Sequence, residues 1–349
     1  VARGGFNFTL RQPMGVIAAI TPWNFPFLIA CWKVAPALAA GNSVVLKPAS
    51  LTPLTALLLG QLAQESGLPD GVLQVLPGAG AEAGNALTTH PLVRKISFTG
   101  STEVGSKIMK LAADDIKRVS LELGGKSPNI VFAEADWQRA AAESPMSVFA
   151  NTGQDCCARS RMFIEQPIFN DFVNQFVAAT ESLKIGDPTN DETQLGPMVS
   201  AAQREISESF VAEARDAGRD IRTGGERQGE HGFYLNPAVI TDVKTDDRAW
   251  CEEIFGPVVC LRPFTDEAKM LQEVNDTSFG LSGSIWSRDL SRALRVARRV
   301  ESGVISINTH SSVHTEAPFG GFKRSGLGRD LGMSAMEACT EVKNIYVGE

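Results

Sequence analysis

A cysteine, a glutamate and an asparagine stand in three short segments whose residue types could act together on a carbonyl group. Cys156 follows a Gly-Gln-Asp turn, Glu122 lies between two leucines, and Asn24 follows a proline and a tryptophan. A cysteine reacts as its thiolate, so it needs a lowered pKa or a nearby base. Glu122 is the candidate base, because apolar neighbours partly desolvate a carboxylate and raise its pKa. Nucleophile, base and amide donor are the parts needed to oxidise an aldehyde through a thioester.

The three motifs resemble those of the NAD(P)-dependent aldehyde dehydrogenase superfamily over almost the whole chain: Asn-Thr-Gly-Gln-Asp-Cys-Cys, Leu-Glu-Leu-Gly-Gly-Lys and Pro-Trp-Asn-Phe-Pro. The resemblance implies that Asn24 and the backbone N–H of Cys156 hold the oxyanion, a contribution often worth roughly 3–4 kcal/mol per donor. It places the nucleophile two residues after Gln154, which favours Cys156 and leaves Cys157 as a packing residue. Relatives that pass the acyl group to coenzyme A lack the glutamate, so Glu122 favours release of a free acid.

Several features predict a dinucleotide site, although none is specific alone. Phe98–Ser101 ends a strand and opens a helix, whose N–H groups suit a pyrophosphate, and the resemblance assigns Ser101 to it. Gly78–Gly84 is one residue too long for a Rossmann fingerprint and suits an ordinary turn equally well. The resemblance assigns Lys47 to the adenosine ribose. Ser50 stands where many NAD-preferring members have glutamate, so we expect NADP to be accepted alongside NAD.

On the nicotinamide side, the segment Glu252–Pro257 matches a family motif. The resemblance implies that Glu253 holds the ribose hydroxyls and that Phe255 packs against the ribose and ring. No metal is expected as a cofactor. The resemblance extends the cofactor set to Thr21, Pro22, Trp23, Gly80, Gly100, Leu123 and Gly124.

Aromatic side chains and one carboxylate are the candidates for substrate selection. Asp155 precedes the nucleophile, as in aminoaldehyde dehydrogenases, and a carboxylate beside aromatic rings attracts a cationic tail. We therefore favour ω-aminoaldehydes or betaine aldehyde. Asp155 equally suits a capping role or a pair with Arg159 or Arg161. For Trp32 we favour the tunnel over core packing. The resemblance implies that these residues approach the substrate tunnel: Trp23, Phe25, Leu28, Trp32, Cys157, Phe163, Ser311 and Phe319.

Two alternatives stay open. Arg159 or Arg161 could bind an acidic semialdehyde such as succinate semialdehyde, which the Lys-Pro-Ala-Ser segment also resembles. A role of another class would be a cofactor-free thiol esterase or a structural protein that has lost catalysis. A panel of aldehydes assayed with NAD and NADP separates these readings.

Composition narrows the class of protein. The 349 residues are 43% hydrophobic and 21% charged with a net charge of -7, which disfavours nucleic acid because phosphate binding needs a basic face. The apolar runs are too short to span a bilayer, and without a signal-like opening we expect a cytoplasmic protein. The absence of a CxxC pair and the four histidines argue against a structural zinc site or a disulfide framework.

Alternating strand and helix patterns predict two parallel-sheet α/β domains. We expect a Rossmann-like cofactor domain at 12–124, with 325–339 returning to it, and a catalytic domain at 125–324. Strands at 1–11 and 340–349 resemble the family's oligomerisation arm, so a homodimer or homotetramer is expected. The chain starts at Val1, and the resemblance leads us to expect that the family's long N-terminal segment is missing.

Overall fold

The computed structural model describes residues 4–348, which fall into two compact units. The first unit comprises Val1–Leu123, Val313–Gly320 and Gly326–Glu349, and the second comprises Gly124–Ser312 and Gly321–Ser325. Residues 1–3 and 349, the outermost part of the expected arm, lie outside the described residues. The chain passes between the units at Leu123 and Gly124, and Val313–Gly320 lies with the first unit.

The first unit contains a six-stranded sheet in the order β14-β6-β5-β2-β3-β4. Its strands are parallel except β14, which pairs antiparallel with β6. The strands are β2 (Val16–Ile20), β3 (Ser43–Lys47), β4 (Leu73–Val75), β5 (Val93–Thr99), β6 (Arg118–Glu122) and β14 (Gly326–Leu327). The helices are α1 (Pro26–Ala39), α2 (Leu54–Glu65), α3 (Asn85–Thr89), α4 (Thr102–Ala113) and α11 (Gly332–Glu337).

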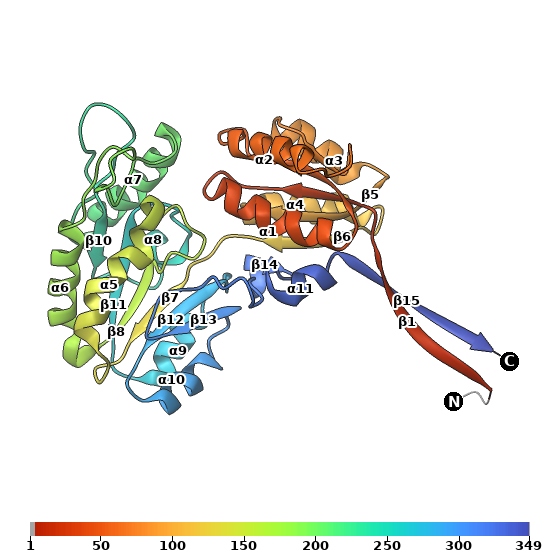
Figure 1. The fold of residues 1–349 in the computed structure, drawn as a ribbon. Helices are drawn as coiled ribbons and strands as arrows, with labels where there is room; N and C mark the ends of the chain where they lie inside the picture. The colour runs from red at the N-terminus through yellow and green to blue at the C-terminus, as the bar shows by residue number, and fades with distance from the viewer. Residues whose placement is uncertain (1–3, 349) are drawn as a thin grey trace. The chain divides into compact units, whose positions relative to one another are not determined.

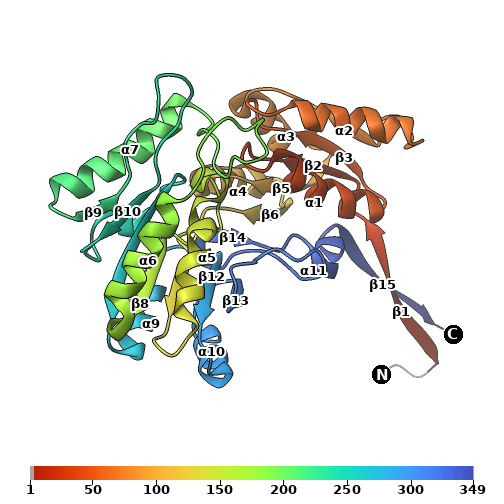
Figure 2. The ribbon, with the colours of Figure 1, turned by 60° about the vertical axis from the view of Figure 1, so that its left-hand side comes forward.

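Helices cover both faces of this sheet (Figures 1 and 2). Side chains alternate along a strand, so Ile17 and Ala19 of β2 pack with α1 and α2, whereas Ala18 and Ile20 pack with α3 and α4. Because both faces of the sheet are covered, β2 is an apolar run on both of its faces.

The second unit contains a seven-stranded sheet in the order β13-β12-β7-β8-β11-β10-β9. Only β9 runs antiparallel to its neighbour. The strands are β7 (Pro128–Val131), β8 (Arg161–Glu165), β9 (Asp220–Thr223), β10 (Ala238–Thr241), β11 (Val258–Phe264), β12 (Ser282–Trp286) and β13 (Val304–Ile307). The helices are α5 (Trp137–Phe149), α6 (Phe169–Glu181), α7 (Ala201–Asp216), α8 (Arg248–Cys251), α9 (Glu267–Asn275) and α10 (Leu290–Ala297).

This sheet too is buried on both faces. Met162 and Ile164 of β8 pack with α5 and α6, and Phe163 packs on the opposite face with α7 to α10. Phe163, expected near the substrate tunnel, is 1% exposed and lies edge-on to Trp250 with ring centroids 5.0 Å apart. It is therefore a core residue, and the expectation of a tunnel role was wrong.

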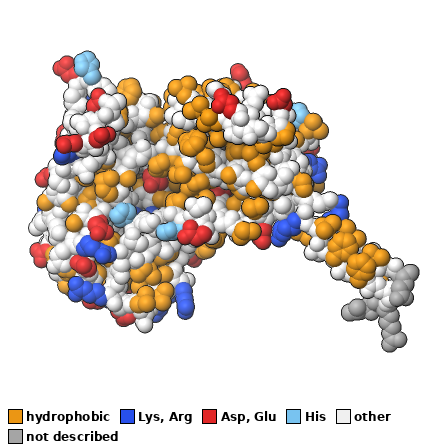
Figure 3. All heavy atoms as spheres, in the orientation of Figure 1, with side chains coloured by type: hydrophobic (Ala, Val, Ile, Leu, Met, Phe, Trp, Pro, Cys, Tyr) orange, Lys and Arg blue, Asp and Glu red, His pale blue; other side chains and the backbone are white. Residues whose placement is uncertain are grey.

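Two long strands, β1 (Gly5–Pro13) and β15 (Thr340–Gly348), form an antiparallel arm. Its apolar side chains are exposed, and Figure 3 shows them gathered along the arm. The exposed set is Phe6, Phe8, Leu10, Val342, Tyr346 and Val347.

The local pattern misled in two respects. A threonine before a proline, as at Thr52 and Pro53, is typical of a capped helix start, but helix α2 begins at Leu54 with Pro53 at its N-cap and no side-chain cap. The short strands β9, β10 and β14 were not predicted from the sequence, because runs of two to four residues carry too little hydrophobic periodicity. Among the described residues, no helix combines the length and apolar character that a bilayer crossing needs.

Candidate active site

The predicted site residues fall into two groups, one in each unit. In the first unit, four parallel strands end at one edge of the sheet, where such folds bind ligands. The register aligns Ile20 with Lys47 and Phe98, and Thr99 with Glu122. The loops that follow these strands carry Asn24, Ser50, Ser101 and Leu123.

Glu122 is the last residue of β6 and is 4% exposed. Gly320 lies directly against it, since a Cβ built on this glycine would stand 2.5 Å from Glu122 Oε1 and 2.9 Å from the Gly328 carbonyl oxygen. The glycine therefore makes room for the carboxylate. No pattern in the sequence predicted this contact.

Asn24 lies between β2 and α1, one residue before the N-cap Phe25, and is half-buried together with Pro22 and Trp23. Thr21 is buried, and its N–H donates to the Lys47 carbonyl at 3.1 Å. This bond ties the loop that carries Asn24 to the end of the neighbouring strand.

The expected ribose and phosphate contacts also lie at this edge. Lys47 is buried, its Nζ donates to the Pro48 carbonyl at 2.9 Å, and desolvation lowers its pKa. Ser50 donates to the Gly78 carbonyl at 3.1 Å, which joins the loops after β3 and β4. Ser101 is the N-cap of α4, where its hydroxyl accepts from Val104 at 3.3 Å.

Gly80, Gly100 and Gly105 of the first unit differ in their surroundings. Gly80 opens a π-helical turn and has open space at its Cβ position, so it is no part of a Rossmann fingerprint. The Gly100 N–H donates to the Glu122 carbonyl at 3.1 Å. Leu123 is buried, and the missing side chain of Gly105 in α4 leaves space for it.

Trp32 and Phe319, both expected at the tunnel, pack edge-to-face with ring centroids 5.2 Å apart. Phe319 is 3% exposed and is held by paired backbone hydrogen bonds with Asp330. Leu28, on the first turn of α1, is exposed. Both aromatic rings thus stabilise the junction of α1 with the returning C-terminal segment.

In the second unit, the cysteine loop follows an abrupt end of α5. Asn151 and Thr152 adopt left-handed φ values of 51° and 57°, and Gly153 follows at 71°. A Cβ on Gly153 would lie 2.1 Å from the Gly256 carbonyl oxygen, so only glycine fits. Buried Gln154 bridges the Asn151 carbonyl and the Val199 N–H, which fixes the residue two positions before the nucleophile.

The two glycines Gly124 and Gly125 allow the cysteine loop to lie close to Glu253. The Gly125 N–H donates to Glu253 Oε1 at 2.9 Å, and a Cβ on Gly124 would lie 2.2 Å from Oε2. On Gly125, a Cβ would lie 2.3 Å from the Cys156 carbonyl oxygen. Burial raises the pKa of Glu253 to about 7, although the Gly125 hydrogen bond opposes this shift. Phe255 has a left-handed φ of 56°, a strain of the kind found at ligand sites.

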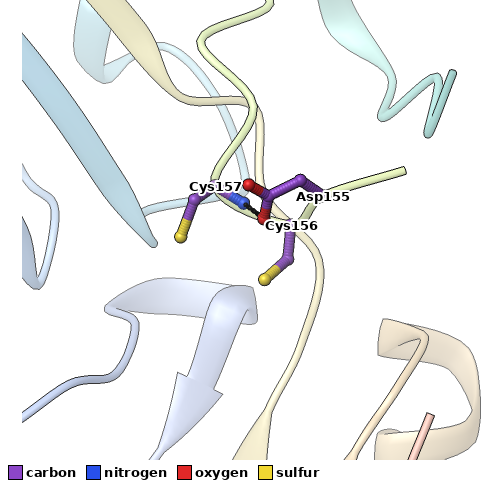
Figure 4. Close-up of side chains that lie close together, drawn as sticks. All are labelled: Asp155, Cys156 and Cys157. Carbon is purple, nitrogen blue, oxygen red and sulfur yellow. Dashed lines mark hydrogen bonds between the residues drawn. The ribbon is translucent and has the colours of Figure 1, made fainter. Parts of the chain in front are cut away.

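Asp155, Cys156 and Cys157 lie side by side on the turn (Figure 4). Asp155 Oδ1 accepts the Cys157 N–H at 2.8 Å, so this side chain caps the turn. The hydrogen bond with Cys157, followed by burial, raises the pKa of the Cys156 thiol well above its usual value. This shift favours the neutral thiol form of the Cys156 side chain.

Arg159 is fully buried beside this turn, and its guanidinium group is surrounded by protein oxygens. It donates to the carbonyl of Cys157 and to other carbonyl and hydroxyl oxygens, those of Ser282, Gly283, Ser284, His310 and Ser312. Arg161 is also buried and donates to the carbonyls of Lys126, Glu273 and Val274. Within residues 4–348, neither arginine forms an ion pair with Asp155, so of the alternatives left open for this carboxylate the structure shows the capping role. Ser311, which was expected at the substrate tunnel, accepts a hydrogen bond from the Ser306 hydroxyl through its backbone carbonyl.

Known proteins resemble this chain over almost its whole length. The model of the aldehyde dehydrogenase family matches residues 1–345. Aminoaldehyde dehydrogenase 2, peroxisomal, of Pisum sativum is 46% identical over 348 residues, covering 98% of this chain and 69% of that protein. Betaine aldehyde dehydrogenase 1 of Oryza sativa subsp. japonica is 45% identical over 341 residues, covering 97% and 68%.

A solved NAD+ complex of an aldehyde dehydrogenase from Bacillus cereus superposes with a TM-score of 0.98. It is 39% identical, and the match covers 100% of this chain and 71% of that one. The fold class and the family expected from the three motifs are confirmed. This chain belongs to the aldehyde dehydrogenase family.

Proposed function

We propose that the protein oxidises an aldehyde to the carboxylic acid with NAD(P)+ through a covalent intermediate on Cys156. The observation that carries the proposal is the position of Gly125, which contacts both the Cys156 backbone and the Glu253 carboxylate. The glycine thus places the nucleophile's loop beside the carboxylate assigned to the nicotinamide ribose. Gly125 follows Glu122 by three positions in the chain.

The residues have distinct tasks. Cys156 adds to the aldehyde carbon, and the Asn24 amide and the Cys156 N–H hold the oxyanion. Glu122 takes the proton of the water that hydrolyses the thioester, and it serves as the base for the thiol. NAD(P)+ held by Lys47, Ser101 and Glu253 would supply the hydride acceptor for this oxidation.

The residues present fit such a cofactor. A half-buried carboxylate suits ribose hydroxyls, and Glu253 supplies it in the space that the missing side chain of Gly124 leaves. Lys47 and the helix N-terminus at Ser101 suit the adenosine ribose and the pyrophosphate. Ser50 leaves no negative charge to repel a 2′-phosphate, so we propose that NADP is also accepted. Ser50→Glu should raise the KM for NADP much more than the KM for NAD; equal changes would contradict this assignment.

The decisive assay follows absorbance of the reduced nicotinamide with a panel of aldehydes, NAD or NADP, and the Cys156→Ala variant as the blank. Turnover that disappears in this variant supports the proposal. Ester hydrolysis without a cofactor, in the absence of aldehyde oxidation, would instead indicate a thiol esterase.

For the substrate we propose ω-aminoaldehydes or betaine aldehyde. Two relatives at 46% and 45% identity are named for these substrates, and Asp155 places a carboxyl group beside the nucleophile. An acidic semialdehyde is less well supported, because Arg159 and Arg161 already donate to protein oxygens.

Asp155→Asn tests this substrate class. The side-chain amide oxygen of the new asparagine can still accept the hydrogen bond from the Cys157 N–H, while the negative charge of Asp155 is removed. We expect kcat/KM to fall for cationic aldehydes and to stay close to wild type for neutral aldehydes of equal length. A uniform fall for both would show that Asp155 only shapes the turn.

We further propose that the arm of β1 and β15 joins subunits into a homodimer or homotetramer, because its exposed apolar residues need a partner surface. Phe8→Asp should lower the sedimentation mass, whereas Thr9→Asp on the same strand serves as the matched control. An unchanged mass for both variants would contradict the role of the arm.

A further inference from the structure

The turn that carries the nucleophile holds three metal-ligating side chains together. One carboxylate oxygen of Asp155 and the sulfur atoms of Cys156 and Cys157 all lie within 4.8 Å of one another (Figure 4). Two thiols and a carboxylate form a donor set typical of Zn²⁺ and of softer divalent ions. The sequence argued against a zinc site because it lacks a CxxC pair, but adjacent cysteines on a capped turn achieve a similar convergence.

The distances lie close to what such an ion requires. With Zn–S bonds of about 2.3 Å, two sulfur ligands of a tetrahedral site stand roughly 3.8 Å apart. Because rotation about χ1 changes the separation of the two sulfur atoms, the proposal requires a pair of rotamers that brings them to this distance. Asp155 Oδ1 is bonded to the Cys157 N–H, so Oδ2 is the oxygen left to face an ion.

The charges also suit a divalent cation. Two thiolates and one carboxylate carry three negative charges, and the neighbouring Arg159 guanidinium carries one positive charge. A divalent ion brings this buried group to neutrality, which avoids the cost of an uncompensated charge away from water. Arg159 is tied to the turn through the Cys157 carbonyl, so its charge stays in place.

We propose that Asp155, Cys156 and Cys157 form an inhibitory site for Zn²⁺ or Cd²⁺. On binding, the two thiols release their protons to solvent and both sulfurs coordinate the ion, while a water completes the tetrahedron. The ion occupies the lone pair with which Cys156 attacks a carbonyl. The ion is a dissociable inhibitor and not a cofactor. Its binding depends only on the three side chains of the turn, whereas the loss of turnover that it causes rests on the proposed function.

Binding is tested without any assay of turnover. Fully reduced protein is titrated with Cd²⁺ while the ultraviolet thiolate-to-cadmium charge-transfer band is followed, and isothermal titration with Zn²⁺ gives the affinity. We expect one tight site. Cys157→Ser should weaken it by at least about tenfold, the smallest loss usual even for partners outside the ligand set. Asp155→Asn should weaken it less.

The matched controls are Cys251→Ser, at an exposed thiol, and Cys260→Ser, at a buried one. The proposal requires both to bind the ion as wild type does. It is overturned if Cys157→Ser binds with unchanged affinity, or if Cys251→Ser removes the tight site. Circular dichroism and thermal unfolding check that each variant folds.

Inhibition is then measured with the aldehyde that gives the highest turnover. Zn²⁺ should inhibit wild type reversibly, with recovery after EDTA, and Cys157→Ser should need at least about ten times more ion. Equal sensitivity would mean that Cys156 alone binds the ion and would overturn the chelate. A protein that binds Cd²⁺ at this turn but oxidises no aldehyde would overturn the proposed function and leave the metal site standing.

Discussion

The backbone N–H of Gly125 donates to Oε1 of Glu253 at 2.9 Å, across 128 positions of sequence. This hydrogen bond holds a buried carboxylate beside the loop of the nucleophile. It does not offset the cost of burying the charge, because burial still raises the pKa of Glu253 to about 7 from 4.5.

This pKa predicts a dependence of stability on pH. Between pH 4.5 and 7 the folded state holds a proton on Glu253 that the unfolded state has lost, so this group lowers stability as pH rises through that window. The decrease amounts to about 3 kcal/mol at most. The wild type should therefore lose stability relative to Glu253→Gln between pH 5 and 8 in urea unfolding. Glu230→Gln, in an exposed loop, is the matched control; a flat difference would contradict the assignment.

The two adjacent cysteines should differ sharply. Cys156→Ser should lower turnover by roughly three orders of magnitude or more, the scale seen when a nucleophile is removed. Cys157→Ser should lower it far less, because its sulfur is buried in the turn. Steady-state rates and trapping of the acyl intermediate by mass spectrometry check both. Equal losses would mean that the nucleophile was assigned to the wrong cysteine or is shared.

Gly320→Ala should impair the base. The new Cβ would stand 2.5 Å from Glu122 Oε1, and displacement of a catalytic group by 1 Å can cost about 100-fold in rate. We expect both kcat and the rate of the first-turnover burst to fall, because Glu122 is proposed to serve as the base for the thiol and for the hydrolytic water. In the control Gly196→Ala the Cβ would meet only Pro188, at 3.7 Å. A normal kcat for Gly320→Ala would show that Glu122 shifts freely.

Arg159→Met should destabilise the protein and loosen the nucleophile's turn. It leaves the Cys157 carbonyl and several hydroxyl groups without their donor, at a cost of about 2–4 kcal/mol. Lysine lacks the planar fork, so Arg159→Lys should restore only part of the stability. Urea unfolding measures the loss, and the rate of Cys156 alkylation reports the position of the turn. The control variant Arg298→Met, at an exposed position, should change neither the free energy of unfolding nor the rate of Cys156 alkylation.

Much of the fold was predictable from local patterns. Proline at the start of α1 and glycine just past its end placed that helix, and the apolar runs of β2, β3 and β5 predicted a sheet buried on both faces. The hydroxyl of Ser101 capping α4 likewise follows from residue type. These features depend on contacts within a few residues, which is why a single sequence carries them.

The candidate residues were also predictable as types, because a cysteine, a glutamate and an amide donor carry their chemistry wherever they stand. Their surroundings were not. The sequence left Arg159 and Asp155 as a possible ion pair, and only the folded chain shows one bonded to hydroxyl and carbonyl oxygens and the other capping a turn.

The sequence by itself therefore determined the reactive groups, the family and the alternation of strands with helices. The tertiary structure decided which groups meet: Gly125 with Glu253 and the Cys156 backbone, and Gly320 with Glu122. These contacts join residues from 31 to nearly 200 positions apart, and such pairings arise from sheet order and from burial of whole faces, which no local pattern encodes.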